Sequence, residues 1–417
     1  MRLAPLMSQF TEQQNSTRFL LRVAYIGFAV TALWRPAEGQ DCLFVLDQLN
    51  NSVVAVARAS NKVIAKIPMP IDDCPQTPCH PMPTSLRVSA DGTRAYVTRQ
   101  DVNLVYVLDP VAKTVVDTAT IDSGSSPTAA SSAAALSPDG ASLYVANLAS
   151  KSVSVISTAT NDLIDTVGVG NRPRAVAFTP DGTTVLVSNS AEATVTAIRA
   201  ADRMVLKTIG VGAGPAGIAV APNGGRAYVA TSTDASVSII DVPSLASAGT
   251  IAVGHAPRAI AFIPDGASAF VTNLLDATVS VIDVAAGMTS GDPITVGGAP
   301  VAIAVTPNGD TAYVANLMSN TISVIDTATR AVDTINGVPA PFDVALGPTC
   351  PAPDPTCTGD CDGNGEVVIS ELITGVNIAL NNQSINVCSD FDADNSGGVE
   401  INELIAAVNN AQAGCNG

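Results

Sequence analysis

The sequence predicts an all-β protein: a seven-bladed β-propeller closed by a shared blade, followed by a small α-helical C-terminal module with two calcium loops. The ring is predicted because a unit of about 42 residues recurs along the chain and contains four short strand-like segments. The module is predicted from a tandem acidic pattern after residue 350. β-Branched alternation with turn signals every 8–12 residues favours strands.

Each unit follows the same order of strand and turn signals. A proline opens a short apolar strand, and a Pro-Asp-Gly or Pro-Asn-Gly turn closes it, as at Pro138 and Pro307. Glycine after Asp or Asn supplies the positive φ that a tight hairpin needs. The second strand carries a Tyr-Val-Ala-Asn element, the third reads Val-Ser-Val-Ile-Asp, and the fourth ends in Val-Gly. Four strands per repeated unit are typical of a propeller blade rather than of a sandwich.

The blade count depends on the two ends of the repeat. A lone first strand stands at 340–348, and residues 42–67 supply a second, third and fourth strand without a first. Joined, these fragments make one shared blade and give seven; six or eight blades are the alternatives. Complete units start near Pro83, Pro127, Pro173, Pro215, Pro257 and Pro300.

Residues 1–39 have the order of a secretory signal peptide. Arg18 and Arg22 precede an apolar run, 23–34, and small residues follow at 37–39. The run is short for a transmembrane helix, which needs roughly 20 apolar residues, and an uncleaved signal anchor is the alternative. Eight cysteines fit an oxidising compartment. We therefore expect a chain that is secreted, on the cell surface or in the periplasm, with no membrane span after signal removal.

The cysteines make a specific prediction for the shared blade. If Pro348 takes the place of Pro138 and Phe44 that of Tyr144, then Cys350 and Cys42 flank a hairpin turn cut open by the chain termini. Their Cα atoms should lie within the 4.4–6.8 Å that a disulfide requires. A Cys42–Cys350 bond is predicted, with a local Cys74–Cys79 bond, and the other four cysteines allow three pairings.

The repeat resembles the YVTN family of β-propellers, whose tetrapeptide stands here as "YVAN", "FVTN" and "YVTR". The resemblance covers the predicted propeller domain, 41–350. It implies a propeller in an extracellular setting, since the family includes archaeal surface-layer proteins and exported bacterial proteins. It implies little about activity, because propellers host many unrelated functions.

A linker, 351–359, leads to the predicted calcium module at 360–417. Oxygen ligands at loop positions 1, 3 and 5, Gly at 6, a carbonyl at 7 and an acid at 12 match the calcium-loop pattern twice. The layout resembles a dockerin, but the loops end in Glu where dockerins usually have Asp, and the polar pair that contacts a cohesin is not evident. The predicted ligands are Asp360, Asp362, Asn364, Glu366 and Glu371, then Asp392, Asp394, Ser396, Gly398 and Glu403.

Little in the propeller points to catalysis, and no catalytic residue is predicted. Only two histidines are present, and the first strands read as small and apolar, with only Arg87 and Asp343 adding charge. If a ligand site exists, it should lie on the face shared by the loops between blades and the loops after the second strands. Its candidates are Asp72, Asp73, His80, Arg99, Arg174 and Arg258. The alternative for the long loop, 70–85, is solvated residues held by the Cys74–Cys79 bond.

These observations predict an exported binding, adhesion or scaffold propeller with a calcium-binding tail. Its partner would be an extracellular protein or glycan. The net charge of −17 argues against nucleic acid, whose phosphates would be repelled. Two alternatives stay open: a calcium-dependent lactonase-like hydrolase, and a component docked onto a larger extracellular complex through its tail.

Overall fold

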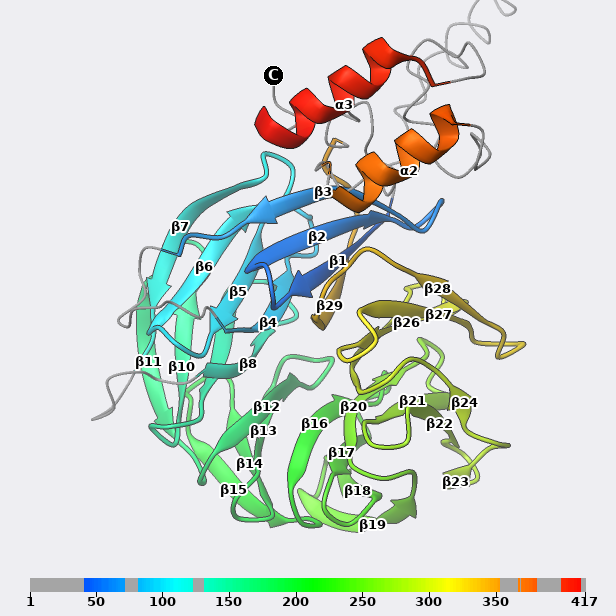
Figure 1. Cartoon of the computed structure of the whole chain (residues 1–417). Helices are drawn as coiled ribbons and strands as arrows, with labels where there is room; N and C mark the ends of the chain where they lie inside the picture. Colours follow the sequence, from blue (N-terminus) through cyan, green and yellow to red (C-terminus); the bar gives the residue numbers. More distant parts are fainter. Residues whose placement is uncertain are drawn as a thin grey trace, which may run out of the picture. The chain divides into compact units, whose positions relative to one another are not determined.

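The computed structural model describes residues 41–71, 82–122, 131–352, 367, 369–380 and 399–413. In these residues the chain is built from short antiparallel strands, followed by two helices near its C-terminal end (Figure 1). No helix in the described ranges is both long and apolar enough to cross a membrane. The predicted signal peptide lies outside the described residues.

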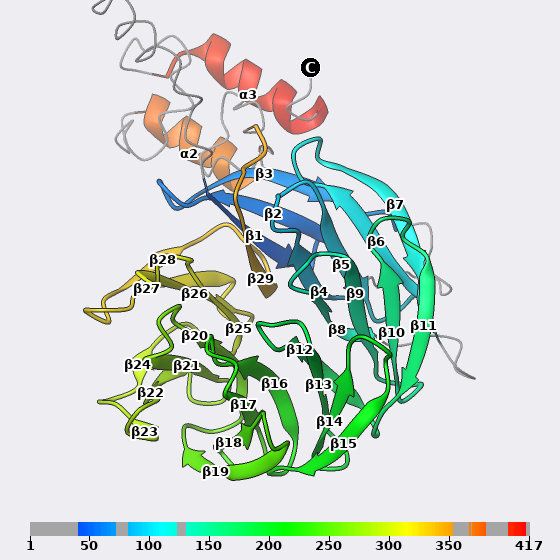
Figure 2. The same cartoon turned by 180° about the vertical axis from the view of Figure 1, so that it is seen from behind.

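The strands form seven sheets arranged as a seven-bladed β-propeller (Figures 1 and 2). Six blades are continuous in sequence. Three of them contain β4 (Pro83–Val88), β5 (Ala95–Arg99), β6 (Leu104–Asp109) and β7 (Thr114–Thr120); β8 (Ser131–Leu136), β9 (Ser142–Asn147), β10 (Ser152–Ser157) and β11 (Leu163–Gly168); and β12 (Pro173–Phe178), β13 (Thr184–Asn189), β14 (Thr194–Arg199) and β15 (Val205–Gly210).

The next three continuous blades follow the same order, with the outer strand of one divided in two. They contain β16 (Pro215–Val220), β17 (Arg226–Thr231), β18 (Ser236–Asp241) and β19 (Ala246–Ala252); β20 (Pro257–Phe262), β21 (Ser268–Asn273), β22 (Thr278–Asp283), β23 (Met288–Thr289) and β24 (Ile294–Thr295); and β25 (Pro300–Val305), β26 (Thr311–Asn316), β27 (Thr321–Asp326) and β28 (Val332–Ile335).

The seventh blade is the predicted shared one. Its strand order is β29 (Pro341–Gly347), β1 (Cys42–Asp47), β2 (Ser52–Ala57) and β3 (Lys62–Pro68). Phe44 pairs with Ala345, as Tyr144 pairs with Ala135 in a continuous blade, so the predicted register is confirmed. The Cys42–Cys350 disulfide is also confirmed, with a Cα–Cα distance of 4.9 Å.

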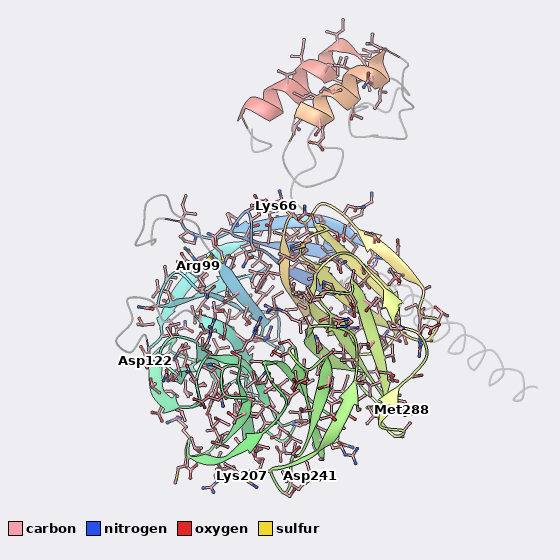
Figure 3. The ribbon with its side chains drawn as sticks, turned by 60° about the horizontal axis from the view of Figure 1, so that its bottom comes forward. Lys66, Arg99, Asp122, Lys207, Asp241 and Met288 are labelled. Carbon is pink, nitrogen blue, oxygen red and sulfur yellow. A yellow bond between two sulfur atoms is a disulfide. The ribbon has the colours of Figure 1, made fainter. Side chains whose placement is uncertain are left out.

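The core lies between the blades rather than inside one sheet. The second and third strands are buried on both faces because a neighbouring blade covers each side, whereas the fourth strands are largely exposed. Fourth-strand residues Lys66, Lys207 and Met288 accordingly lie on the outer circumference (Figure 3). A large second-strand side chain joins each of the seven inter-blade clusters of the described ring: Phe44, Tyr96, Tyr144, Leu186, Tyr228, Phe270 and Tyr313.

Turn residues pack from one blade to the next. An added Cβ on Gly182 would touch Pro138, and one on Gly224 would touch Pro180, both at ordinary van der Waals distance. Gly92 packs more closely against Pro348 and Thr349, where the two ends of the ring meet, since an added Cβ would lie 2.9 Å and 2.8 Å from them. The innermost strands of neighbouring blades also contact one another all the way around, including β29 with β4. The ring is therefore closed by packing as well as by the disulfide.

A buried asparagine ends the second strand in four of the described blades. The Nδ2 of Asn189, for example, donates hydrogen bonds to the hydroxyls of Thr194 (3.1 Å) and Thr196 (2.9 Å) on the next strand. The Asn that ends the Tyr-Val-Ala-Asn element therefore ties the second strand to the third. Its counterparts are Asn147, Asn273 and Asn316.

The two helices are α2 (Ile369–Ala379) and α3 (Ile401–Ala413), each beginning where a predicted calcium loop ends. Ile378 and Ala407 form their buried contact, with Leu372, Leu404 and Val399 packed against it. The sequence after each loop has apolar residues at helical spacing, which predicts that Val376, Leu380 and Val408 are buried, but all three are exposed. The helices themselves are as predicted, but a different stripe of α2 is buried.

Candidate functional site

A cavity of about 450 Å³ lies at the centre of the ring. Its lining comes from the inner strand of every blade: β4, β8, β12, β16, β20, β25 and β29. Gln100, Leu148 and Arg172 also line it, from loops that follow second strands or precede a first strand. The cavity therefore lies at the face on which the sequence placed a ligand site.

Arginines dominate the charge of this cavity. Arg87, Arg172, Arg174 and Arg258 line it, and Asp343 is the one acidic residue among the described lining residues. The expectation that only Arg87 and Asp343 would bring charge to the channel is therefore wrong. Alternating side chains of a first strand point to opposite faces, and Arg174 and Arg258 occupy the position directly after the opening proline.

Arg87 and Asp343 neutralise one another. Their Nη1 and Oδ2 atoms are 2.9 Å apart, and Arg87 Nε donates to the carbonyl of Ala134 at 2.7 Å. Asp343 also accepts hydrogen bonds from the backbone N–H groups of Leu86 and Val344. Both side chains therefore hold neighbouring inner strands together, and their capacity for binding a ligand is largely used.

The remaining three arginines have no such partner. In the described part of the chain, the side chains of Arg172, Arg174 and Arg258 have no ion pair and no hydrogen bond. Burial, reinforced by the positive charge of Arg172, lowers the pKa of Arg174. Arg258 lies over the ring of Phe342, with its guanidinium carbon 5.6 Å from the ring centroid.

Arg172 was missed by sequence reasoning because it precedes the strand. Its backbone φ is 55°, a left-handed conformation that costs an ordinary residue free energy. The equivalent residues in four other blades are the small Gly214, Ala256, Ala299 and Ala340, also at positive φ. The signal was the pair of arginines around Pro173, which no other unit carries.

The hydroxyls near the cavity serve the seams between blades. Thr84 Oγ1 donates to the carbonyl of Ser131 at 3.0 Å, and Ser132 Oγ donates to the carbonyl of Pro173 at 2.8 Å. Ser131 Oγ donates to the carbonyl of Arg99 at 2.7 Å. These groups already have partners, so the three unpaired arginines are the principal donors left for a ligand.

Arg99 does not lie on the rim where the sequence placed it. Its side chain is fully buried (0% exposed) and pairs with Asp101, with Nη1 donating to the carbonyl of Pro70 and to the hydroxyl of Tyr106. Burial opposes ionisation of Asp101, but hydrogen bonds from Arg99 and from the Met82 N–H outweigh it and lower the pKa of that carboxyl. Arg99 occupies the position of Asn189 and performs its structural role.

Several predicted residues lie outside the described part of the chain. These are Asp72, Asp73 and His80, the Cys74–Cys79 pair, and the calcium-loop residues Asp360, Asp362, Asn364, Glu366, Asp392, Asp394, Ser396 and Gly398. The described ranges contain no group of three or more His, Cys, Asp or Glu side chains placed to hold a metal ion.

The two glutamates that end the predicted calcium loops are described, and both are buried. Glu371 is 7% exposed and Glu403 is 4% exposed, each in the first turn of a helix. Glu403 Oε2 accepts a hydrogen bond from the N–H of Glu400 at 2.8 Å, which is half of a capping box. Buried carboxylates at the position where a calcium loop needs its bidentate acid fit such a site.

Two family models match parts of the chain. The model for the seven-bladed lactonase β-propeller matches residues 83–212, and the model for YNCE-like β-propellers matches residues 261–351. Both support a propeller. The first match covers three continuous blades, and the second ends in the first strand of the closing blade. No curated protein sequence matches this chain.

Solved structures show the same fold at low sequence identity. Hydrazine synthase of Kuenenia stuttgartiensis is 21% identical, with a TM-score of 0.58, covering 64% of this chain and 90% of that one. A protein of unknown function from Desulfotomaculum acetoxidans is 17% identical (TM-score 0.61; coverage 75% and 99%). A candidate 6-phosphogluconolactonase of Bacteroides uniformis is also 17% identical (TM-score 0.59; coverage 74% and 99%). At this identity the likeness shows the fold alone.

Proposed function

We propose that this protein is an exported binding protein whose propeller holds an anionic ligand in its central cavity. The observation that supports it is the set of three unpaired arginines, Arg172, Arg174 and Arg258, in one cavity. Their charge stands against a chain that is strongly acidic overall, at −17. Several arginines around one cavity of an otherwise acidic protein create a positive electrostatic potential there, which attracts anions.

Arginine suits this role by its geometry. Its planar guanidinium presents a rigid fork of donors that binds carboxylate, phosphate or sulfate in a bidentate way. Repulsion between Arg172 and Arg174 disfavours the empty cavity, and an anion would relieve it. The ligand-binding role predicted for Arg174 and Arg258 is kept in this proposal, and Arg172 joins them.

An exported setting is supported by two features. A disulfide such as Cys42–Cys350 is typical of proteins that fold in an oxidising compartment. The YVTN-type tetrapeptide and the 42-residue repeat resemble those of propellers at cell surfaces, and this resemblance implies an extracellular setting. The ligand would then be a small acid or an acidic group on an extracellular glycan or protein.

The test is calorimetry on the full secreted chain with gluconate, phosphate and sulfate at low ionic strength. Arg174→Gln and Arg172→Gln should each weaken binding of a responsive anion at least tenfold, because each removes one charged donor from the cavity. Arg199→Gln is the matched control, since Arg199 is the last residue of β14, does not line the cavity, and is half exposed and paired with Asp202. Equal weakening by the control, or anion binding unaffected by both cavity variants, contradicts the proposal.

A lactonase-like hydrolase is the second candidate, favoured by the family match over residues 83–212 and by the candidate 6-phosphogluconolactonases among similar structures. In the described lining the one carboxylate, Asp343, is occupied by Arg87, so a general base would have to come from outside these residues. Hydrolysis of gluconolactone or its 6-phosphate, followed with and without calcium, tests it. Turnover abolished by Arg174→Gln would support an enzyme.

We also propose that the C-terminal part binds calcium through its two loops, with Glu371 and Glu403 each supplying the last carboxylate. Calcium would offset repulsion among carboxylates and order the loops. In the full chain, a calcium titration should show two sites, and Glu371→Gln and Glu403→Gln should each weaken one of them. A titration that stays at zero or one site contradicts the pair. Calcium-dependent capture on a cohesin would identify a dockerin-type partner.

A further inference from the structure

We infer that the cavity is built for an amphipathic acid, one anionic group on an apolar body, rather than for a polyhydroxylated sugar acid. The inference deepens the proposed function and rests on it. It is carried by the unequal distribution of polar and apolar side chains around the ring.

One side of the cavity is polar. Three consecutive inner strands, β4, β8 and β12, contribute its cationic and hydroxyl groups. The polar side chains that these strands add to the lining are those of Thr84, Ser85, Arg87, Ser131, Ser132 and Arg174, and the adjoining loops add Gln100 and Arg172. Since the hydroxyls of Thr84, Ser131 and Ser132 already donate to carbonyls of the seams, this side offers charge rather than a set of free hydroxyl partners.

The other side is apolar. The strands β16, β20, β25 and β29 line the cavity with Ile218, Ile260, Val301, Ile303, Phe342 and Val344. Two charged residues also lie on this side: Asp343 pairs with Arg87 on the neighbouring strand β4, and Arg258, which has no ion pair or hydrogen bond within the described residues, lies over the ring of Phe342. Burial of a ligand's hydrocarbon surface against this wall is favourable, whereas the hydroxyls of a sugar buried there would have no hydrogen-bond partners.

The strand between the two unpaired arginine positions carries small residues. β16 stands between β12, which holds Arg174, and β20, which holds Arg258, and it lines the cavity with Ala216 and Gly217. A Cβ on Gly217 would lie 2.5 Å from the carbonyl oxygen of Arg258, so the two strands approach closely there. A carboxylate can therefore be approached from both arginines beside Ala216 and Gly217, while Ile218 of the same strand belongs to the apolar wall.

The mouth of the cavity shows the same division. The turns after the second strands lie at this end, because Gln100 and Leu148 from such turns line the cavity. In three consecutive blades the next residue of that turn is large, apolar and exposed: Leu275 (72%), Met318 (81%) and Leu49 (72%). The equivalent residues on the polar side are Asp101, Ala149 and Ala191. The apolar half thus continues to the surface in three of its four blades, and the fourth carries Thr233 at this position.

The size of the cavity fits a small molecule. About 450 Å³ lies in the range of ordinary ligand pockets, roughly 300–1,000 Å³. A ring or short chain with one carboxylate can be enclosed there, with the carboxylate on the arginines and the hydrocarbon against Ile260, Ile303 and Val344.

The test compares ligands of equal charge on the full secreted chain. Cyclohexanecarboxylate and gluconate each carry one carboxylate, and cyclohexanecarboxamide has the apolar ring without the charge. We expect cyclohexanecarboxylate to bind at least tenfold more tightly than gluconate and at least tenfold more tightly than the amide. In Arg174→Gln, cyclohexanecarboxylate should bind no more tightly than the amide. Val301→Thr keeps the shape of the side chain, and it should reduce the ratio of the affinity for cyclohexanecarboxylate to the affinity for gluconate.

The outcomes separate the two proposals. Gluconate binding as tightly as cyclohexanecarboxylate, with dependence on Arg174, overturns the amphipathic preference and leaves the anion site in place. The amide binding as well as the acid, or binding of both acids independent of Arg172 and Arg174, overturns the anion site itself. A cyclohexanecarboxylate advantage unaffected by Val301→Thr while Arg199→Gln reduces it also overturns the inference, because the ligand would then bind outside the cavity.

Discussion

The closing blade and a continuous blade reach the same geometry by different covalent routes. In the blade β12–β15, Ala177 pairs with Leu186 through a hairpin whose turn is closed by the chain itself. In the closing blade, Ala345 pairs with Phe44 from the other end of the repeat region, 301 positions away in the sequence. The shared register teaches that packing between blades selects the pairing, and chain continuity is not required for it.

What differs is how the end of the hairpin is secured. In the continuous blade, Asp181 accepts hydrogen bonds from the Thr183 N–H (3.0 Å), the Thr183 hydroxyl (2.9 Å) and the Thr179 hydroxyl (2.5 Å). In the closing blade the Cys42–Cys350 bond stands at that place. At the end of this hairpin, the disulfide therefore takes the place of the hydrogen bonds that Asp181 accepts in the continuous blade.

The largest effect should come from removing this bond. Cys42→Ser/Cys350→Ser frees a segment with a sequence separation of 308, and the chain-entropy model gives a loss of about 5–6 kcal/mol in the free energy of unfolding. Guanidinium unfolding of the variant and of the reduced wild type should agree. Hydrogen exchange should rise first in β1 and β29. Equal protection of these strands and of β12 and β13 in the variant would show that the two blades do not differ.

The next effect tests packing across the closure. Gly92 (φ 71°) faces the closing blade, and an added Cβ would lie 2.8 Å from Thr349 Oγ1 and 2.9 Å from Pro348 Cγ. Gly140 (φ 70°) has nothing within 4 Å of that position. Both Ala variants carry the left-handed strain of roughly 1–2 kcal/mol. Gly92→Ala should cost about 1–3 kcal/mol more through the steric clash. Equal loss of thermal stability in the two variants contradicts packing at the closure.

A smaller effect belongs to the turn of the continuous blade. Asp181→Ala should cost about 1–2 kcal/mol at neutral pH by removing the acceptor of three donors. Asp181→Asn should cost less, because Asn308 fills the same place in another blade and accepts from the Thr306 hydroxyl at 2.6 Å. Urea unfolding at pH 7 measures both. A larger loss for Asn than for Ala runs against the hydrogen-bond explanation.

The same turn predicts a dependence on acid pH. Hydrogen bonds from Thr179 and Thr183 lower the pKa of Asp181 below its ordinary 3.8. A carboxyl with a depressed pKa in the folded state contributes stability that is present above that ordinary value and is lost as the pH falls through the folded pKa. The difference between wild type and Asp181→Ala should therefore shrink below about pH 4. A constant difference from pH 7 to pH 3 would exclude this origin.

The smallest effect concerns Asp47, which in the closing blade stands where Asn189 stands in the continuous one. Burial outweighs the hydrogen bonds from Asn50 and raises the pKa of Asp47. The folded state then holds the proton more tightly, so its stability falls as the pH rises from about 4 toward the raised pKa. Asp47→Asn should gain about 1 kcal/mol at pH 7, as repeat-consensus changes commonly do, and lose that advantage near pH 4. A gain of the same size at both values would contradict the titration.

The ring, its blade count, its shared blade and its disulfide could all be predicted from the sequence. Each depends on short-range signals that repeat: a proline before a strand, Asp-Gly or Asn-Gly at a turn, an aromatic residue at a fixed distance from it. Because the unit recurs, the missing pieces at 42–67 and 340–348 could be aligned with a complete one, and the positions of Cys42 and Cys350 followed.

The content of the cavity could be predicted only in part. Arg174 and Arg258 line the cavity, but Arg99 does not, because it occupies the position of Asn189, whose side chain is buried in the blade. That equivalence was visible in the sequence as "YVTR" against "LVSN". Arg172 could not be placed in the same way, because a loop residue before a strand has no periodicity to show where its side chain lies.

The sequence by itself determined the blade, its turns and the register of the closing strands, because these follow from neighbours a few residues apart and from the two-residue period of a strand. Only the tertiary structure decided that one half of the central cavity is cationic and the other apolar. That property belongs to no single blade, since each inner strand contributes only three residues to the lining. It arises when seven inner strands, from β4 to β29, are brought around one axis and their side chains face one another.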